Sequence, residues 1–111
     1  MTPVDSIIAV DLAAVAVLFS FGMFALISKT NLIKMVIGIE LMGKAVTLSF
    51  IVGGFISGST GLSQSVVFTV IAIEAVVAAL ALALVIISKA AFKTIEVDKM
   101  NSIAASEEAD K

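Results

Sequence analysis

Three long apolar runs, separated by short polar links, constrain what this 111-residue chain can fold into. The runs cover residues 7–27, 32–56 and 62–88. Each has 20 or more residues, and an α-helix of that length, rising 1.5 Å per residue, crosses a hydrocarbon core of about 30 Å. The links are too short to hold a domain, so neighbouring helices must run in opposite directions. The sequence therefore predicts an all-α membrane protein with three antiparallel transmembrane helices.

Lysines at the ends of the runs set the expected orientation. Lys29 and Lys34 flank the first link, and Lys89 and Lys93 follow the third run, whereas the second link and the N-terminus have no lysine. Cytoplasmic segments carry an excess of positive charge. We therefore expect the first link and the C-terminal tail to face the cytoplasm and the N-terminus to lie outside.

This orientation divides the chain into two parts. We expect residues 1–92 to form a multi-pass domain in the cell (inner or cytoplasmic) membrane. Residues 93–111 mix lysines with five acidic residues. We expect them to form a cytoplasmic tail whose last eight or so residues are disordered, as chain termini often are.

The residue types that the chain lacks exclude several kinds of chemistry. It has no histidine or cysteine, which excludes an imidazole or thiolate metal site and a nucleophile of the Ser-His or Cys-His kind. Any redox cofactor must then belong to a partner. The net charge is −2 and there is no arginine, which argues against a nucleic-acid surface.

Three ionisable residues lie deep inside the apolar runs. Glu40 and Lys44 are one helical turn apart in the second run, and Glu74 is near the middle of the third. A charged residue at the centre of a bilayer costs about 2.5–3.5 kcal/mol on insertion scales, and such residues mark ion pathways and proton relays. All three ionised would leave one uncompensated negative charge in a low dielectric, so we expect one carboxyl to hold a proton at pH 7. We predict that the three form a proton relay.

Other polar positions are weaker candidates. Asp11, about one turn inside the first run, and Lys34 are possible minor members of the relay, although an acidic residue at that depth is more often an interface residue. Thr47 can bond back to its own helix, and Ser63 favours capping at the start of the third helix. Gly43 and the other small residues favour close helix packing.

Three helices cannot enclose a water-filled path, yet these helices carry buried charges. The missing walls must come from other subunits, so the expected partners are the lipid bilayer and the membrane subunits of a larger complex. A structural alternative stays open, in which the ion pair fixes helix register and Glu74 bonds to a neighbour.

Three stretches in and just before the second run carry a resemblance to a known family: Asn31-Leu32-Ile33-Lys34-Met35, Gly38-Ile39-Glu40-Leu41-Met42 and Ala45-Val46. They are similar to the second helix of NADH-quinone oxidoreductase subunit K, also called chain 4L. Glu74-Ala75, in an Ala- and Val-rich third run, looks like that family's second membrane glutamate, and the resemblance extends over residues 21–89. It implies that Glu40 and Glu74 correspond to two carboxylates linking the quinone-proximal region to antiporter-like subunits.

The chain also departs from that family. Respiratory members usually carry asparagine where this chain has Lys44 and again where it has Thr47. Residues 61–67 and 79–84 look more like the small subunits of membrane-bound hydrogenases and multisubunit sodium/proton antiporters. Antiporter versions generally lack the third-helix glutamate. Quinone reductase, ferredoxin-linked hydrogenase and antiporter therefore stay open as branches.

The leading functional prediction is a small ion-translocating subunit of a complex I-like oxidoreductase or membrane-bound hydrogenase, without a redox site of its own. It would couple electron transfer to H⁺ or Na⁺ transport. The resemblance implies antiporter-like partners, with iron–sulfur clusters, flavin or a nickel-iron centre in other subunits. The alternatives are an antiporter subunit and a purely structural or assembly subunit. A drug-resistance type of transporter fits less well, because the chain has three spans and no Trp or Tyr.

Overall fold

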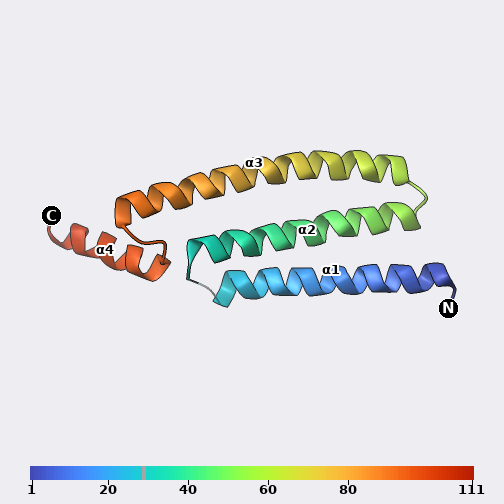
Figure 1. The fold of residues 1–111 in the computed structure, drawn as a ribbon, viewed down its shortest axis with the longest axis horizontal. Coiled ribbons are helices and arrows are strands. Elements are labelled where there is room, and N and C mark those ends of the chain that lie inside the picture. Colours follow the sequence, from blue (N-terminus) through green and yellow to red (C-terminus); the bar gives the residue numbers. More distant parts are fainter. Residues whose placement is uncertain (29) are drawn as a thin grey trace.

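The computed structural model describes residues 1–28 and 30–111, and that part of the chain is helical. Lys29, on which the predicted orientation partly depends, lies outside the described residues. The helices are α1 (Pro3–Ser28), α2 (Leu32–Ile56), α3 (Thr60–Phe92) and α4 (Val97–Ala109) (Figure 1). The first three are long and apolar enough to cross a membrane, which confirms the all-α class and the three predicted spans.

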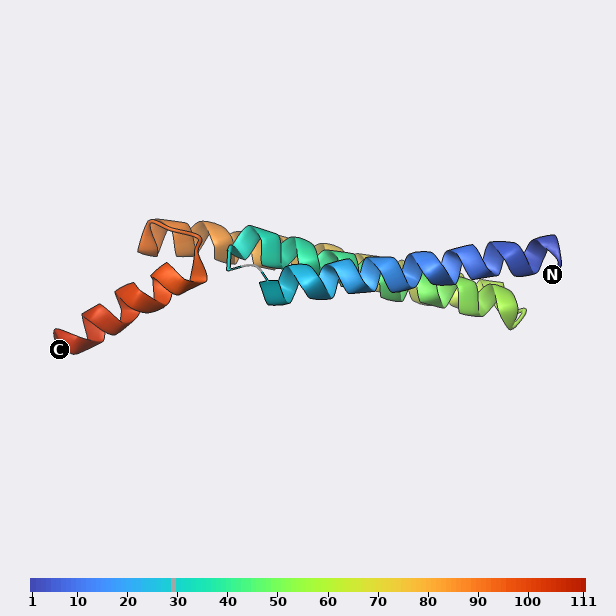
Figure 2. The same cartoon turned by 90° about the horizontal axis from the view of Figure 1, so that it is seen from below.

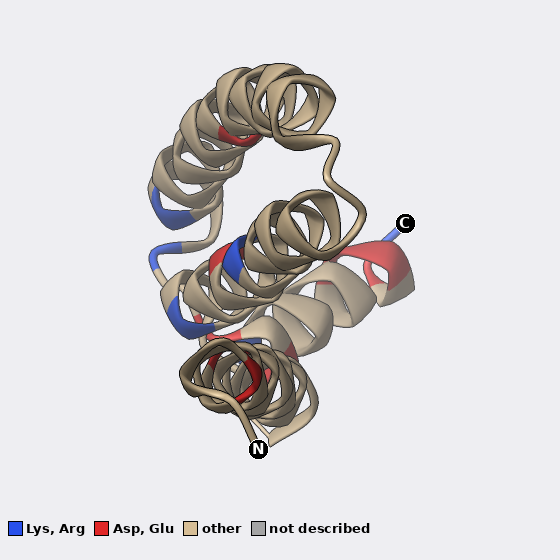
Figure 3. Ribbon diagram, turned by 90° about the vertical axis from the view of Figure 1, so that its right-hand side faces the viewer, with Lys and Arg blue, Asp and Glu red and all other residues tan. Residues whose placement is uncertain are grey.

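The three long helices form a single layer. The chain turns back at each link, so that α2 lies between α1 and α3 in both Figure 1 and Figure 3. The molecule measures 66 × 26 × 17 Å, and α4 leaves the layer at an angle in Figure 2. A layer of three helices has two open faces, and it does not enclose a path.

Local signals extend α1 and α3 beyond the apolar runs. Pro3 occupies the first position of α1, where its missing N–H costs nothing. Thr2 and Asp5 cap that end reciprocally: the Asp5 N–H donates to Thr2 Oγ1 at 3.2 Å, and the Thr2 N–H donates to Asp5 Oδ2 at 2.9 Å. α3 has 33 residues, about 50 Å, and ends at Phe92, where Lys93, with a left-handed φ of 59°, caps it. This helix is therefore longer than a hydrocarbon core.

Glycines bring α1 and α2 into close contact. A Cβ added to Gly22 would lie 2.6 Å from Met42 Cγ and 2.7 Å from the Gly38 carbonyl oxygen. A Cβ added to Gly38 would lie 2.9 Å from the Gly22 carbonyl oxygen and 3.1 Å from Ala25 Cβ. The prediction that small residues allow close helix approach holds at this crossing, which depends on two glycines facing each other.

Ser63 joins α3 to α2 near the second link. Its hydroxyl donates to the Phe50 carbonyl oxygen at 2.5 Å, and a side chain on Gly54 would overlap it. The expected capping role of Ser63 is wrong, because α3 already begins at Thr60, after Ser59, and Ser63 lies within the helix. Its hydroxyl points across to the neighbouring helix instead.

At the other end of the layer, the first link pairs with the segment that follows α3. The Leu32 N–H donates to the Ile95 carbonyl at 2.9 Å, and the Val97 N–H donates to the Thr30 carbonyl at 2.9 Å. We call this antiparallel pairing the link–tail bridge. It holds the ends of α1, α2 and α3 together.

Glu96 adds side-chain bonds to the link–tail bridge. Its carboxylate accepts from the Thr30 hydroxyl at 2.8 Å and from the Asn31 amide at 3.0 Å. The Thr30 hydroxyl, followed by the Asn31 amide, holds the pKa of the Glu96 carboxyl below its usual range. Asn31 also caps α2, since its side-chain oxygen accepts from two N–H groups of the first turn.

The tail carries a fourth helix that was not predicted from the sequence. This helix, α4, extends as far as Ala109. The link–tail bridge fixes the start of α4, and Asp98 in the first turn interacts favourably with the helix dipole. Met100 and Ile103 are half-buried. The start of this polar helix is therefore fixed by hydrogen bonds to the first link.

Candidate functional site

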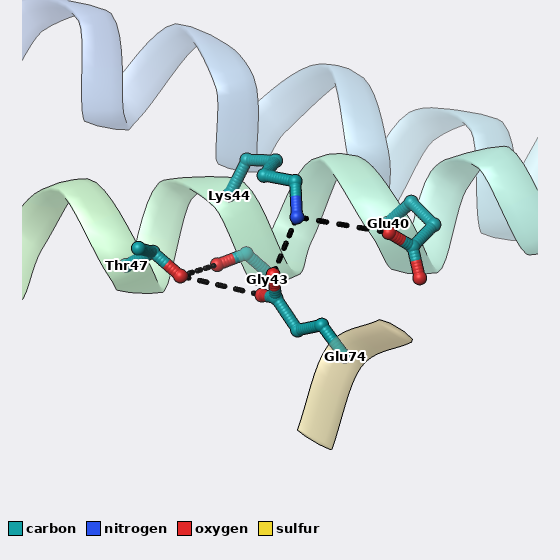
Figure 4. A network of polar contacts seen from close by, with 5 residues as sticks. All are labelled: Glu40, Gly43, Lys44, Thr47 and Glu74. Atoms are coloured by element: carbon teal, nitrogen blue, oxygen red, sulfur yellow. Dashed lines mark hydrogen bonds and ion pairs between the residues drawn. The ribbon is translucent and has the colours of Figure 1, made fainter. Parts of the chain in front are cut away.

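α2 and α3 bring the three predicted relay residues together (Figure 4). Glu40 and Lys44 share a face of α2 because they are four residues apart, and Glu74 reaches them from α3. The Lys44 Nζ donates to Glu74 Oε2 at 2.5 Å and lies 3.8 Å from Glu40 Oε2. The ammonium group therefore stands between two carboxylates from different helices, and it contacts Glu74 more closely.

The second carboxylate oxygen of Glu74, Oε1, lies against Gly43 and Thr47 of α2. The Thr47 hydroxyl lies 3.3 Å from Glu74 Oε1 and 3.0 Å from the Gly43 carbonyl oxygen. A Cβ added to Gly43 would overlap Glu74 Oε1. The missing side chain at Gly43 thus makes the notch into which the carboxylate fits, and Thr47 closes one side of that notch.

Glu74 is the most buried member of the cluster, whereas Glu40 and Lys44 are open to a hollow between α2 and α3 on one face of the layer. The Glu74 side chain is 14% exposed, whereas those of Glu40 and Lys44 are 30% and 51% exposed. A hollow of about 310 Å³ lies beside Glu40 and Lys44, with apolar walls that include Val36 and Leu82. In a membrane, this open side must meet lipid or another protein surface.

The charge balance of the cluster determines its chemistry. Two carboxylates and one ammonium carry a net charge of −1 when all are ionised. Burial in a low dielectric disfavours uncompensated charge, and one added proton would make the cluster neutral.

The two minor candidates lie outside the cluster. Asp11 is on α1, eleven residues before the Gly22 crossing, or about 16 Å along the helix axis. Lys34 is in the first turn of α2, close enough to Glu96 to help lower its pKa. Within residues 1–28 and 30–111, the ion pairs join only Glu40, Lys44 and Glu74. Figure 3 shows how sparse charge is on the long helices.

Sequence reasoning missed the roles of Gly43 and Thr47. It treated Gly43 as ordinary packing and Thr47 as a residue that bonds back to its own helix. The back-bond exists, but the same hydroxyl also contacts Glu74. A signal was present, since Glu40, Gly43 and Thr47 recur at i, i+3 and i+7 and therefore share one helix face with the first carboxylate.

Comparisons with known proteins identify the family of this chain. Residues 11–105 match the family model described as NADH-ubiquinone/plastoquinone oxidoreductase chain 4L. The chain is similar to the NADH-quinone oxidoreductase subunit K of Chlorobaculum parvum, with 36% identity over 88 residues, covering 78% of this chain and 81% of the relative. It is 35% identical over 89 residues to the subunit K of Chlorobaculum tepidum, covering 78% and 80%. The resemblance inferred from the sequence is confirmed: this chain belongs to the chain 4L family of NADH-quinone oxidoreductases.

Proposed function

We propose that this chain is an ion-translocating membrane subunit of a complex I-like NADH-quinone oxidoreductase and that Glu40, Lys44 and Glu74 relay protons. The observation that carries the proposal is the Lys44 ammonium group, which lies between carboxylates of two helices. When one carboxyl binds a proton, it attracts the ammonium less, and the ammonium can shift toward the other carboxylate. A proton on α3 thereby changes the charge environment on α2.

The proposed orientation has the N-terminus outside and the tail in the cytoplasm, with the three spans antiparallel. Lysine placement supports it, because Lys34, Lys89 and Lys93 fall at one end of the layer. The link–tail bridge supports it too, since it joins the first link to the tail at that end. The chain has no cysteine, so single cysteines at Ser59 and Ser106 would give unambiguous thiol labelling. We expect labelling from opposite sides, and labelling of both from one side would contradict the three-span orientation.

Other subunits complete the site in this proposal. The exposed sides of Glu40 and Lys44 would contact a neighbouring membrane subunit, of the antiporter-like kind that the family resemblance implies. Iron–sulfur clusters and flavin would lie in further subunits. Both relatives are named NADH-quinone oxidoreductase subunit K, which favours the quinone-reductase branch over the hydrogenase and antiporter alternatives.

The test replaces each glutamate with glutamine, which keeps the shape and removes the exchangeable proton. In vesicles holding the assembled complex, Glu40→Gln and Glu74→Gln should lower ion pumping driven by electron transfer, while the yield of complex stays close to wild type. Glu107→Gln, in the exposed part of α4, is the control and should pump normally. Wild-type pumping by both membrane variants in fully assembled complex would show that the two residues are structural.

A further inference from the structure

Thr47 is a buried hydroxyl whose two possible acceptors compete. The residue is 6% exposed and lies on α2, facing α3. Its hydroxyl is within hydrogen-bond distance of both the Gly43 carbonyl oxygen and Glu74 Oε1. A hydroxyl has one proton to donate and two lone pairs that accept. Thr47 can therefore donate to only one of these oxygens at a time, while its own oxygen can accept a hydrogen bond from a neighbouring donor.

We propose that Thr47 is a positioning residue that keeps Glu74 hydrogen-bonded both when its carboxyl is ionised and when it is protonated. The proposal rests on the proposed function in one respect, that Glu74 exchanges a proton. With Glu74 ionised, Thr47 donates to Oε1 and Lys44 donates to Oε2. With a proton bound at Oε1, the Glu74 hydroxyl donates to Thr47 Oγ1, and the Thr47 proton turns to the Gly43 carbonyl. Glu74 gains one proton and Thr47 keeps its own.

The surroundings of Glu74 support this exchange. A buried polar group without a partner is costly, so a carboxyl that changes protonation state needs a neighbour able both to donate and to accept. The charged groups facing Glu74 are Lys44 and Glu40, both on α2. The lysine can only donate, and Glu40 is beyond it. Thr47 is the neighbouring side chain with both capacities, and the notch at Gly43 brings the carboxyl within its reach.

A matched position distinguishes this role from ordinary back-bonding. Thr69 on α3 makes the same kind of bond to its own helix, from its hydroxyl to the Ser65 carbonyl at 3.0 Å. It is exposed, and among the described residues its hydroxyl bonds to no carboxylate. If Thr47 acted only on its own helix, replacing either threonine with valine would have the same effect.

The experiment compares Thr47→Val, Thr47→Ser and Thr69→Val in the assembled complex in native membranes. The main measurement is the infrared carbonyl stretch of protonated Glu74 in protein labelled with ¹³C-glutamate, identified by its loss in Glu74→Gln. In Thr47→Val we expect this band to move to higher wavenumber, because a carboxyl that loses its hydrogen bond has a stiffer carbonyl. Ion pumping should fall roughly tenfold, the effect of one hydrogen bond on a barrier. Thr47→Ser and Thr69→Val should match the wild type in both measurements.

Several results would overturn the inference. An unshifted band in Thr47→Val would do so, as would the lack of any Glu74 carboxyl band across the accessible pH range. Equal losses of pumping in Thr47→Val and Thr47→Ser would show that the shape of the side chain matters and its hydroxyl does not. Failure of the proposed function would give a different result. Glu74→Gln would then pump normally, whether or not the carbonyl band of Glu74 shifts in Thr47→Val.

Discussion

Adding one methyl group to the notch should separate Glu74 from its partners. In Gly43→Ala the new Cβ would overlap Glu74 Oε1, so the carboxylate must withdraw toward α3. It then leaves Thr47 and loosens its contact with Lys44. The matched control is Gly53→Ala, on the same helix, where an added Cβ meets nothing within 4 Å.

The comparison isolates the interaction at the notch. Replacing glycine with alanine favours a helix by roughly 0.8–1 kcal/mol, and this gain is common to both variants. Only Gly43→Ala also loses a charge-assisted hydrogen bond, worth about 1.5–3 kcal/mol. The Glu74 side chain is 14% exposed, so solvent replaces little of that loss. At about 1.4 kcal/mol per factor of ten, the population with Lys44 bound to Glu74 should fall roughly tenfold to a hundredfold.

Ion pumping in vesicles and the yield of assembled complex together measure this effect. We expect Gly43→Ala to assemble and pump slowly, and Gly53→Ala to behave as the wild type. Shortening the acidic side chain should partly restore pumping, so Gly43→Ala combined with Glu74→Asp should exceed Gly43→Ala alone. Equal pumping by Gly43→Ala and Gly53→Ala in fully assembled complex would refute the argument that the notch positions Glu74.

Two further predictions follow from the charges. Lys44→Met leaves two carboxyls without a cation, so we expect the yield of complex to fall. Adding Glu40→Gln should restore part of the yield, and no recovery in the double variant would contradict the charge-balance argument. Hydrogen bonds from Thr30 and Asn31 lower the pKa of Glu96, so its ionised form stabilises the link–tail bridge above the ordinary pKa of a glutamate. That contribution should be lost as the pH falls through the lowered pKa. The protection factors of the tail amides against hydrogen exchange should then fall in acid, less so in Glu96→Gln, and an equal fall in both would exclude Glu96 as the cause.

Hydropathy and length were enough to predict the spans, and helical spacing was enough to pair Glu40 with Lys44. The sequence grouped Glu74 with Glu40 and Lys44, but the geometry of their contact needed the structure, because the residues around Glu74 are apolar and give no periodic signal of a packing face. Gly22, opposite Gly38, was missed for the same reason. A helix that is hydrophobic all round gives no periodic signal of its packing face.

The helix in the tail and the contacts at its start were not predicted, for a different reason. The polar composition of the tail resembles that of a disordered terminus, and the contacts at the start of its helix come from residues more than sixty positions earlier in the chain. Asn31 caps α2, and nothing in its sequence neighbourhood indicates a second partner such as Glu96. Polar pairs between links that lie far apart in the sequence cannot be predicted from local sequence patterns.

The link–tail bridge has a consequence for biogenesis. Its partners are 65 and 66 residues apart, so it cannot form until the ribosome has released the whole of α3 and the first residues beyond it. Closing so long a loop would be costly for a free chain, but insertion of the spans already brings the two links to one end of the layer. The bridge is therefore among the last contacts that a nascent chain makes. A chain whose third span fails to insert would leave Asn31 and Leu32 unpaired, an exposed edge by which membrane proteases could distinguish it from a finished subunit.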